Sequence, residues 1–244
     1  MSATTRSVPL RALIAATAVA GAAVAVAGGA HADLSHPAVL ASLVALAFGA
    51  ELFAVGIFRD SHVSASGAAL MAAGALFGLF GVAMAAAAIA VAGHLRTQRP
   101  AVKTVFNAAT FAIAGAAYVA TFRALEGGGA ALSFPHLLLP ALVAGVVNMA
   151  VNSALVTGAI ALDRGESPAG VWERNFLWLV PQYVVLGAVA AGMAMAAAQW
   201  GPWALLLFAL PAASLAESLR VRAQATAVLS ALEAGNLPAR PKAA

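Results

Sequence analysis

Residues 134–174 read FPHLLLPALVAGVVNMAVNSALVTGAIALDRGESPAGVWER, an apolar segment at 136–161 followed by a polar one. A helix of about 20 apolar residues crosses the hydrocarbon core of a bilayer, so the segment is long enough to be a transmembrane helix. It nevertheless contains Asn148 and Asn152, which are four positions apart and therefore share one helical face. Because a side-chain amide needs a hydrogen-bond partner in hydrocarbon, we expect that face to turn toward other helices.

The composition of the whole chain is typical of a membrane protein. Of its 244 residues 63% are hydrophobic and only 9% are charged, and the mean hydropathy is +0.93. Charges cluster between long apolar runs, which predicts an all-α, polytopic bundle of transmembrane helices with about seven or eight membrane segments. The 13 Lys and Arg residues are scattered at the ends of these runs. The predicted partner is therefore the lipid bilayer, and no nucleic acid is expected.

The first 33 residues allow two interpretations. Arg6 and Arg11 precede an apolar run, and Ala30-His31-Ala32 has the small-x-small form of a signal-peptide cleavage site. The run at 10–30 is also long enough to remain as a first transmembrane helix, and we favour this interpretation over a cleaved signal peptide. Both place residues 1–9 in the cytoplasm.

The second apolar run, residues 38–58, contains Glu51, the one acid clearly inside a predicted span. A charged side chain at the membrane centre costs about 2.5–3.5 kcal/mol on insertion scales, so it is tolerated mainly where it faces a bundle interior, a partner or water. Glu51 is therefore either a protonated or hydrogen-bonded structural residue, one that lies nearer the membrane surface, or a ligand or proton site. The structural interpretation is the commoner one.

Residues 67–93 form a long apolar run with Gly78-Leu79-Phe80-Gly81 at its centre. The run is either one tilted helix or two short segments that reverse at the glycines. A single crossing would place four Lys and Arg residues in the cytoplasm and nine outside, whereas a reversal places twelve in the cytoplasm and only Arg123 outside. Because basic residues concentrate on the cytoplasmic side, we predict a hairpin at about residues 63–96, either re-entrant or a pair of full crossings.

The same rule predicts that both termini are cytoplasmic in a multi-pass protein of the cell inner (plasma) membrane. The membrane domain covers residues 10–216, and 217–244 form a short cytoplasmic helix and tail. Spans beyond the hairpin are predicted at residues 104–122, 136–161, 177–198 and 203–216. The side chains predicted to lie at the cytoplasmic membrane face are Arg99, Lys103, Trp172, Arg174 and Tyr183.

Motifs of catalysis are missing from the sequence. The five histidines fall at loop or span boundaries without the H-x-x-x-H spacing of a helical metal site, and no Walker loop, G-x-S-x-G or dinucleotide fingerprint occurs. We therefore predict no enzymatic activity, no metal and no cofactor. The candidate ligand-binding residues are instead the polar ones inside predicted spans: Glu51, Asn107, Asn148 and Asn152. We predict that they converge on one internal site; the alternative is that each hydrogen-bonds a neighbouring helix.

The order of these features resembles the amino-terminal membrane region found ahead of HD-GYP phosphodiesterase and diguanylate cyclase domains in bacterial signalling proteins. The resemblance covers most of residues 10–220. It is carried by Glu51, Arg59 with Val63-Ser64, Arg99-Pro100-Ala101-Val102-Lys103 followed by Phe106-Asn107, Val147-Asn148, Asn152, Gly165, Trp172-Glu173-Arg174-Asn175, and Pro181 with Tyr183.

This resemblance implies a sensory or ligand-binding membrane module. Residues 226–234 resemble the helix that opens an HD-GYP domain, but neither the His-Asp metal motif nor the GYP signature follows, so an output enzyme is not expected. Buried amides in short helices also suit a small-solute transporter or its substrate-binding membrane subunit, and a structural scaffold is a third hypothesis. The partners expected are a small-molecule ligand and a cytoplasmic signalling or transport protein.

Overall fold

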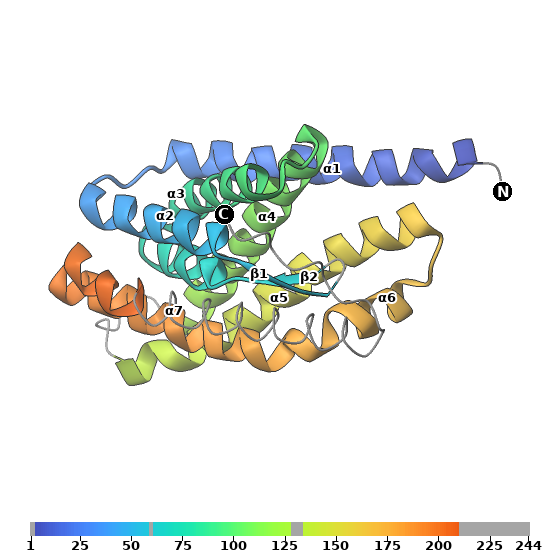
Figure 1. Cartoon of the computed structure of the whole chain (residues 1–244). Helices are drawn as coiled ribbons and strands as arrows, with labels where there is room; N and C mark the ends of the chain where they lie inside the picture. The colour runs from blue at the N-terminus through green and yellow to red at the C-terminus, as the bar shows by residue number, and fades with distance from the viewer. Residues whose placement is uncertain (1–2, 59–60, 128–133, 210–244) are drawn as a thin grey trace, which may run out of the picture.

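The computed structural model describes residues 3–58, 61–127 and 134–209, which form a bundle of helices (Figure 1). Within these ranges five helices are long and apolar enough to cross a membrane, so the chain is an integral membrane protein with an almost entirely helical fold. The number of membrane segments, predicted as seven or eight, stays a prediction. The helices are α1 (Ala3–Ala30), α2 (Pro37–Leu52), α3 (Ser66–Thr97), α4 (Ala101–Glu126), α5 (Phe134–Arg164), α6 (Pro168–Asn175) and α7 (Val180–Trp200), with 3-10 turns η1 (Leu177–Leu179) and η2 (Pro202–Leu205).

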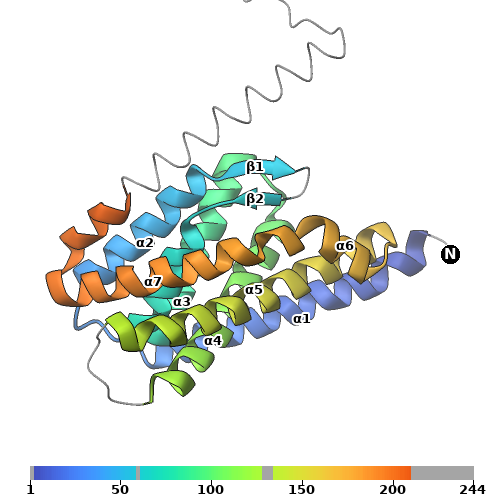
Figure 2. The same ribbon diagram turned by 90° about the horizontal axis from the view of Figure 1, so that it is seen from below.

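The second predicted span is shorter than expected. We predicted an apolar run over 38–58, but α2 ends at Leu52, and β1 (Val55–Phe58) pairs antiparallel with β2 (Ser61–Val63). Val55 and Ile57 favour a strand and Gly56 disfavours a helix, which accounts for the change. Figure 2 shows the two strands at the edge of the bundle beyond the end of α2. Glu51 consequently lies in the last turn of α2, not deep inside a span.

Helix α3 reverses direction at Gly78, whose φ of 59° and ψ of −142° are not helical. Its two ends meet at Glu51: the Ser66 hydroxyl donates a hydrogen bond of 2.9 Å to one carboxylate oxygen, and Arg96 Nη2 lies 3.6 Å from the other. In a straight helix of this length the ends would be about 48 Å apart. The arms on either side of Gly78 therefore run antiparallel, and the reversal predicted from the charges occurs in the structure.

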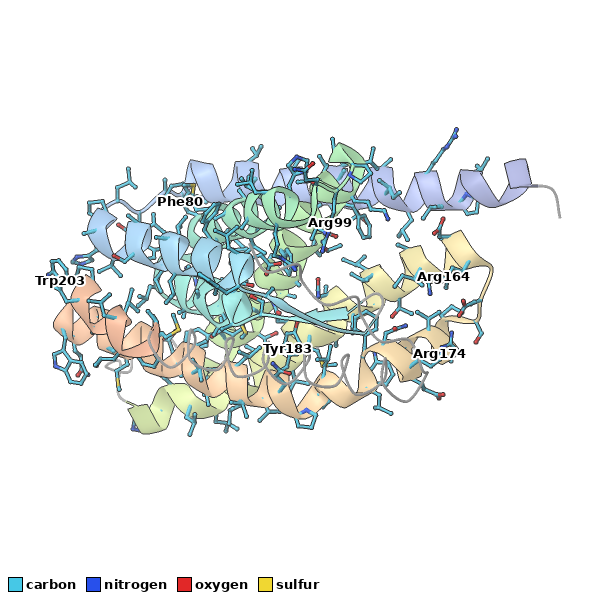
Figure 3. All side chains as sticks on the ribbon, in the orientation of Figure 1. Phe80, Arg99, Arg164, Arg174, Tyr183 and Trp203 are labelled. Carbon is cyan, nitrogen blue, oxygen red and sulfur yellow. The ribbon has the colours of Figure 1, made fainter. Side chains whose placement is uncertain are left out.

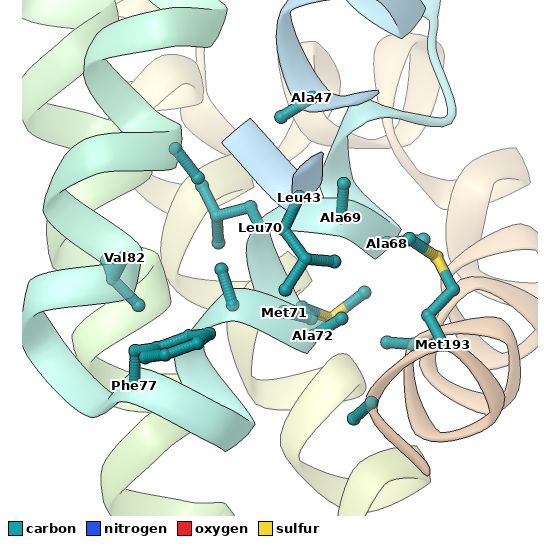
Figure 4. Packing of buried hydrophobic residues seen from close by; sticks show 14 of the residues in the cluster. Leu43, Ala47, Ala68, Ala69, Leu70, Met71, Ala72, Phe77, Val82 and Met193 are labelled. Carbon is teal, nitrogen blue, oxygen red and sulfur yellow. The ribbon is translucent and has the colours of Figure 1, made fainter. Parts of the chain in front are cut away.

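The two arms of α3 approach each other closely because small residues face the contact. A Cβ added to Gly81 would lie 2.2 Å from the carbonyl oxygen of Ala73, and one added to Gly74 would lie 3.0 Å from Val82. Figure 4 shows this core, in which Leu43 of α2 and Met193 of α7 pack against the first arm of α3. Any larger side chain at Gly81 would force the arms apart.

Helix α1 packs on the bundle through two glycines that share one face. A Cβ on Gly21 would lie 2.6 Å from the Cα of Ala109, and a Cβ on Gly28 would lie 2.7 Å from the carbonyl oxygen of Leu79 at the α3 reversal. Backbone contacts this close are a device of transmembrane helix packing. They favour the interpretation of α1 as a retained transmembrane helix, which stays a prediction.

The two ends of the bundle differ in chemistry. Figure 3 shows Arg164 and Arg174 toward the end where α1 begins, Arg99 nearer the middle, and Phe80 and Trp203 toward the other end. Of the last predicted span, 203–216, only residues up to 209 are described; they comprise most of η2 and the start of a helix. The predicted cytoplasmic segment 217–244 lies outside the described residues.

Candidate functional site

A cavity of about 620 Å³ opens at the arginine-rich end of the bundle. Its walls come from helices α1, α2, α3, α4, α5 and α7, so no single helix forms it. Its polar and charged lining consists of Glu51, Ser64, Ser66, His94, Arg96, Arg99, Lys103, Thr104, Asn107, Thr110, Asn152, Ser153, Asp163, Arg164 and Tyr183. A cavity of this size is in the range of small-molecule sites, about 300–1,000 Å³.

Glu51 is the most deeply buried charged group of the cavity, with 3% of its surface exposed. Its carboxylate accepts the Ser66 hydroxyl and faces Arg96, whose Nη1 also donates a hydrogen bond of 3.3 Å to the carbonyl oxygen of Ala54. Arg96 therefore links the end of α3 to the end of α2 through both charge and backbone. The ion pair with Arg96 fixes the position of the Glu51 carboxylate but does not compensate the other charged side chains that line the cavity.

The opposite wall is formed by Asn152 of α5 and Tyr183 of α7. The two side chains lie close to each other, and Tyr183 is near enough to Glu51 to interact with its charge. The Oδ1 atom of Asn152 is buried and has no hydrogen-bond partner among the described residues. A side-chain acceptor is therefore left available in the wall of the cavity.

Cations gather where α3 turns into α4. Arg99 lies in this turn, between Gln98, which ends α3 in a left-handed conformation (φ 50°), and Pro100, which begins α4. Burial lowers the pKa of Arg99 from its usual value, and the charge of Arg96 lowers it further, while Glu51 raises it. The guanidinium of Arg96 therefore disfavours the charged form of Arg99.

A side-chain contact closes the same turn. His94 Nδ1 lies 3.1 Å from the hydroxyl oxygen of Thr104, which joins the last turn of α3 to the first turn of α4. Lys103, the neighbour of Thr104, also lines the cavity. The contact between His94 and Thr104 therefore stabilises a turn whose basic side chains line the cavity.

The predicted ligand residues are only partly brought together. Glu51, Asn107 and Asn152 line the common cavity, whereas Asn148 is buried but is not among the lining residues. Asn148 lies one helical turn before Asn152, about 6 Å farther from the arginine-rich end. That these three lining residues bind a ligand stays a prediction.

The five residues predicted at the cytoplasmic face separate into two groups. Arg99, Lys103 and Tyr183 line the cavity. Trp172 and Arg174 lie on α6: the Trp172 indole donates a hydrogen bond of 3.2 Å to Ser153, and Arg174 pairs with Glu166 on the exposed surface.

Sequence reasoning missed Ser66 and Arg96, which both contact Glu51. Both stand at the ends of apolar runs, where polar residues are expected in any membrane protein. The signal that could have found them is the hairpin itself, because a reversal at Gly78 brings its two ends together beside the end of the preceding helix.

Searches of protein families, of curated proteins and of solved structures find no match to this chain. In the ranges that the structure describes, no three His, Asp or Glu side chains are grouped so that they could hold a metal ion.

Proposed function

We propose that this protein is a ligand-binding module of the membrane, comparable to the sensory regions of bacterial signalling proteins, and that it binds a small molecule in the cavity. The observation that supports this most is that six helices line one space, and that α2, α3, α4 and α5 each contribute a buried polar side chain to it. A ligand that contacts several helices can favour one arrangement of them over another, which is how binding is passed to a partner. In this proposal the protein has no catalytic role of its own.

A small-solute transporter, or its substrate-binding membrane subunit, is the second candidate. The helix break at Gly78 supports it, because interrupted helices are a feature of transporters. However, transporter sites usually lie near the membrane midplane, whereas this cavity is lined by the ends of α2 and α3 and the starts of α4 and α7. The sensory proposal is therefore the stronger one.

We also propose that the arginine-rich end faces the cytoplasm, that each arm of α3 counts as a membrane segment, and that both chain termini are cytoplasmic in the inner membrane. Reporter fusions test this arrangement. Alkaline phosphatase fused after Gly127 should be active, because that site would be outside, whereas fusions after Gln98 and Ala244 should be inactive. Active fusions at both Gln98 and Ala244 would contradict it.

The ligand proposal predicts the effect of filling the cavity. Ala159 of α5 lines the cavity, so Ala159→Phe should exclude a small molecule that copurifies with the wild-type protein. Ala154→Phe on the same helix is the matched control, because Ala154 is exposed and does not line the cavity. Mass spectrometry of extracts should find the molecule in wild type and in Ala154→Phe, but reduced at least tenfold in Ala159→Phe.

Thermal unfolding of both variants must accompany this comparison, since a misfolded variant would also lose its ligand. A folded Ala159→Phe protein that retains the same molecule at wild-type occupancy would refute binding in the cavity. Binding in the cavity would also be refuted if the folded wild-type protein bound no small molecule under any of the conditions used for the variants.

A further inference from the structure

We infer that the ligand of this cavity is an amphiphilic anion, a molecule with a phosphate or carboxylate group attached to an apolar body. This inference rests on the proposed function and specifies the chemistry of its ligand. It is carried by the balance of charge in the cavity, by polar atoms without partners, and by the apolar part of the lining.

The cavity has more cations than acids. Four Arg and Lys side chains line it, namely Arg96, Arg99, Lys103 and Arg164, against the two acids Glu51 and Asp163. Arg96 faces Glu51, but within the described part of the chain neither Arg99 nor Lys103 has an ion-pair partner. Arg99 is half-buried and close enough to Arg96 for the two charges to repel, and an anion beside them would remove this repulsion; Lys103 is exposed and adds a further positive charge to the cavity wall.

Two polar atoms in the cavity walls specify the ligand further. Arg96 Nε is a buried donor and Asn152 Oδ1 a buried acceptor, and neither has a hydrogen-bond partner among the residues described. Buried polar groups in proteins are nearly always hydrogen-bonded. Because both atoms are fully buried, a ligand reaches them only if the side chains of Arg96 and Asn152 turn toward the cavity; an acidic group can then accept from Arg96 Nε, while a hydroxyl or amide on the same ligand can donate to Asn152.

The remainder of the lining is apolar. Side chains such as Ile89, Phe106, Phe111, Met149, Val156 and Leu186 share the cavity with the charged groups. A small inorganic anion would leave this surface in contact with water, whereas an alkyl or ring portion would cover it. The headgroup and upper chain of an anionic lipid, and a soluble amphiphilic acid, both have this chemistry.

The test uses the full-length protein in phosphatidylcholine nanodiscs, with the thermal unfolding midpoint as the readout. Octyl phosphate is the probe, octanol is the neutral control of equal chain length, and inorganic phosphate is the control without an apolar body. Octyl phosphate should raise the midpoint at concentrations at least tenfold below those at which either control does. Equal effects of octyl phosphate and octanol would overturn the inference.

Charge variants locate the binding. In Arg99→Gln and in Lys103→Gln the octyl phosphate needed for half of the midpoint shift should rise about tenfold, since each removes one charge-assisted contact. Arg174→Gln is the matched control, because Arg174 lies toward the same end but is exposed and outside the cavity. An unchanged response in both cavity variants, measured on folded protein, would also overturn the inference.

A further measurement distinguishes a lipid from a soluble acid as the source of the anion. A comparison of two results distinguishes failure of the anionic-ligand inference from failure of the proposed function. If the ligand is a lipid, native mass spectrometry from nanodiscs that contain phosphatidylglycerol should show phosphatidylglycerol bound to the wild-type protein but not to Arg99→Gln. If neither protein retains phosphatidylglycerol while octyl phosphate still binds, the ligand is a soluble acid. If Ala159→Phe excludes a neutral molecule while octyl phosphate has no effect, the proposed function stands and the anionic ligand is refuted.

Discussion

Arg96→Met is expected to lower the free energy of unfolding by about 3 kcal/mol, because it removes the cation that faces the buried carboxylate of Glu51. Glu51 is 3% exposed and Arg96 is 21% exposed, so the pair is largely removed from water. The loss should be at the lower end of the range for buried pairs, since Ser66 still donates to the carboxylate. Unfolding by sodium dodecyl sulfate in mixed micelles, followed by tryptophan fluorescence, measures it.

The double variant Glu51→Leu with Arg96→Met isolates the cause. Removing both charges replaces a buried ion pair by apolar groups, which is often neutral for stability, so the double variant should recover most of the loss. Arg174→Met is the control, because its pair with Glu166 is exposed and should contribute less than about 1 kcal/mol. If Arg96→Met and Arg174→Met are equally stable, Arg96 does not compensate Glu51.

Gly81→Ala is expected to lower the free energy of unfolding by about 3 kcal/mol, at the upper end of the usual cost of overpacking. The added methyl would lie 2.2 Å from the carbonyl oxygen of Ala73. This neighbour is backbone, so it cannot rotate away, and the two arms of α3 would have to separate. The same unfolding assay measures the loss.

Gly49→Ala is the matched control on the neighbouring helix. A Cβ at Gly49 would meet no atom within 4 Å, so the same substitution is sterically free there. Alanine is favoured over glycine inside a helix by about 0.5–1 kcal/mol, so this variant should be as stable as wild type or slightly more stable. Equal stability of Gly81→Ala and Gly49→Ala would contradict the close packing of the hairpin.

Much of the fold could be predicted from the sequence because hydropathy and basic residues report directly on membrane helices. The apolar runs mark the helices, and the charge distribution predicted the reversal at Gly78. Residues 55–58 were wrongly included in an apolar run predicted as a span, because a short apolar strand and the end of an apolar helix have the same hydropathy. Val55 and Ile57, the β-branched residues on either side of Gly56, favour a strand over a helix, but this preference is weak.

The residues of the candidate site that could be predicted are polar side chains inside apolar runs, where a polar group is energetically costly. Glu51, Asn107 and Asn152 could be named because each lies within an apolar run, and all three line the cavity. Arg96 could not be named as a partner of Glu51, since it is one of several basic residues that follow a span. Its position opposite Glu51 depends on how tightly the hairpin closes, and that is determined by packing at Gly74 and Gly81.

The short elements around Glu51 also affect the lipid that surrounds the protein. Helix α2 has 16 residues and is about 24 Å long, and the arm of α3 over residues 66–77 is about 18 Å long. Both fall short of the hydrocarbon thickness of about 30 Å, whereas α4, with 26 residues, exceeds it. Bilayers adapt to such mismatch by local thinning, at a cost of fractions of a kcal/mol for each ångström. The protein should therefore impose a step in bilayer thickness, with short-chain lipids collecting beside α2.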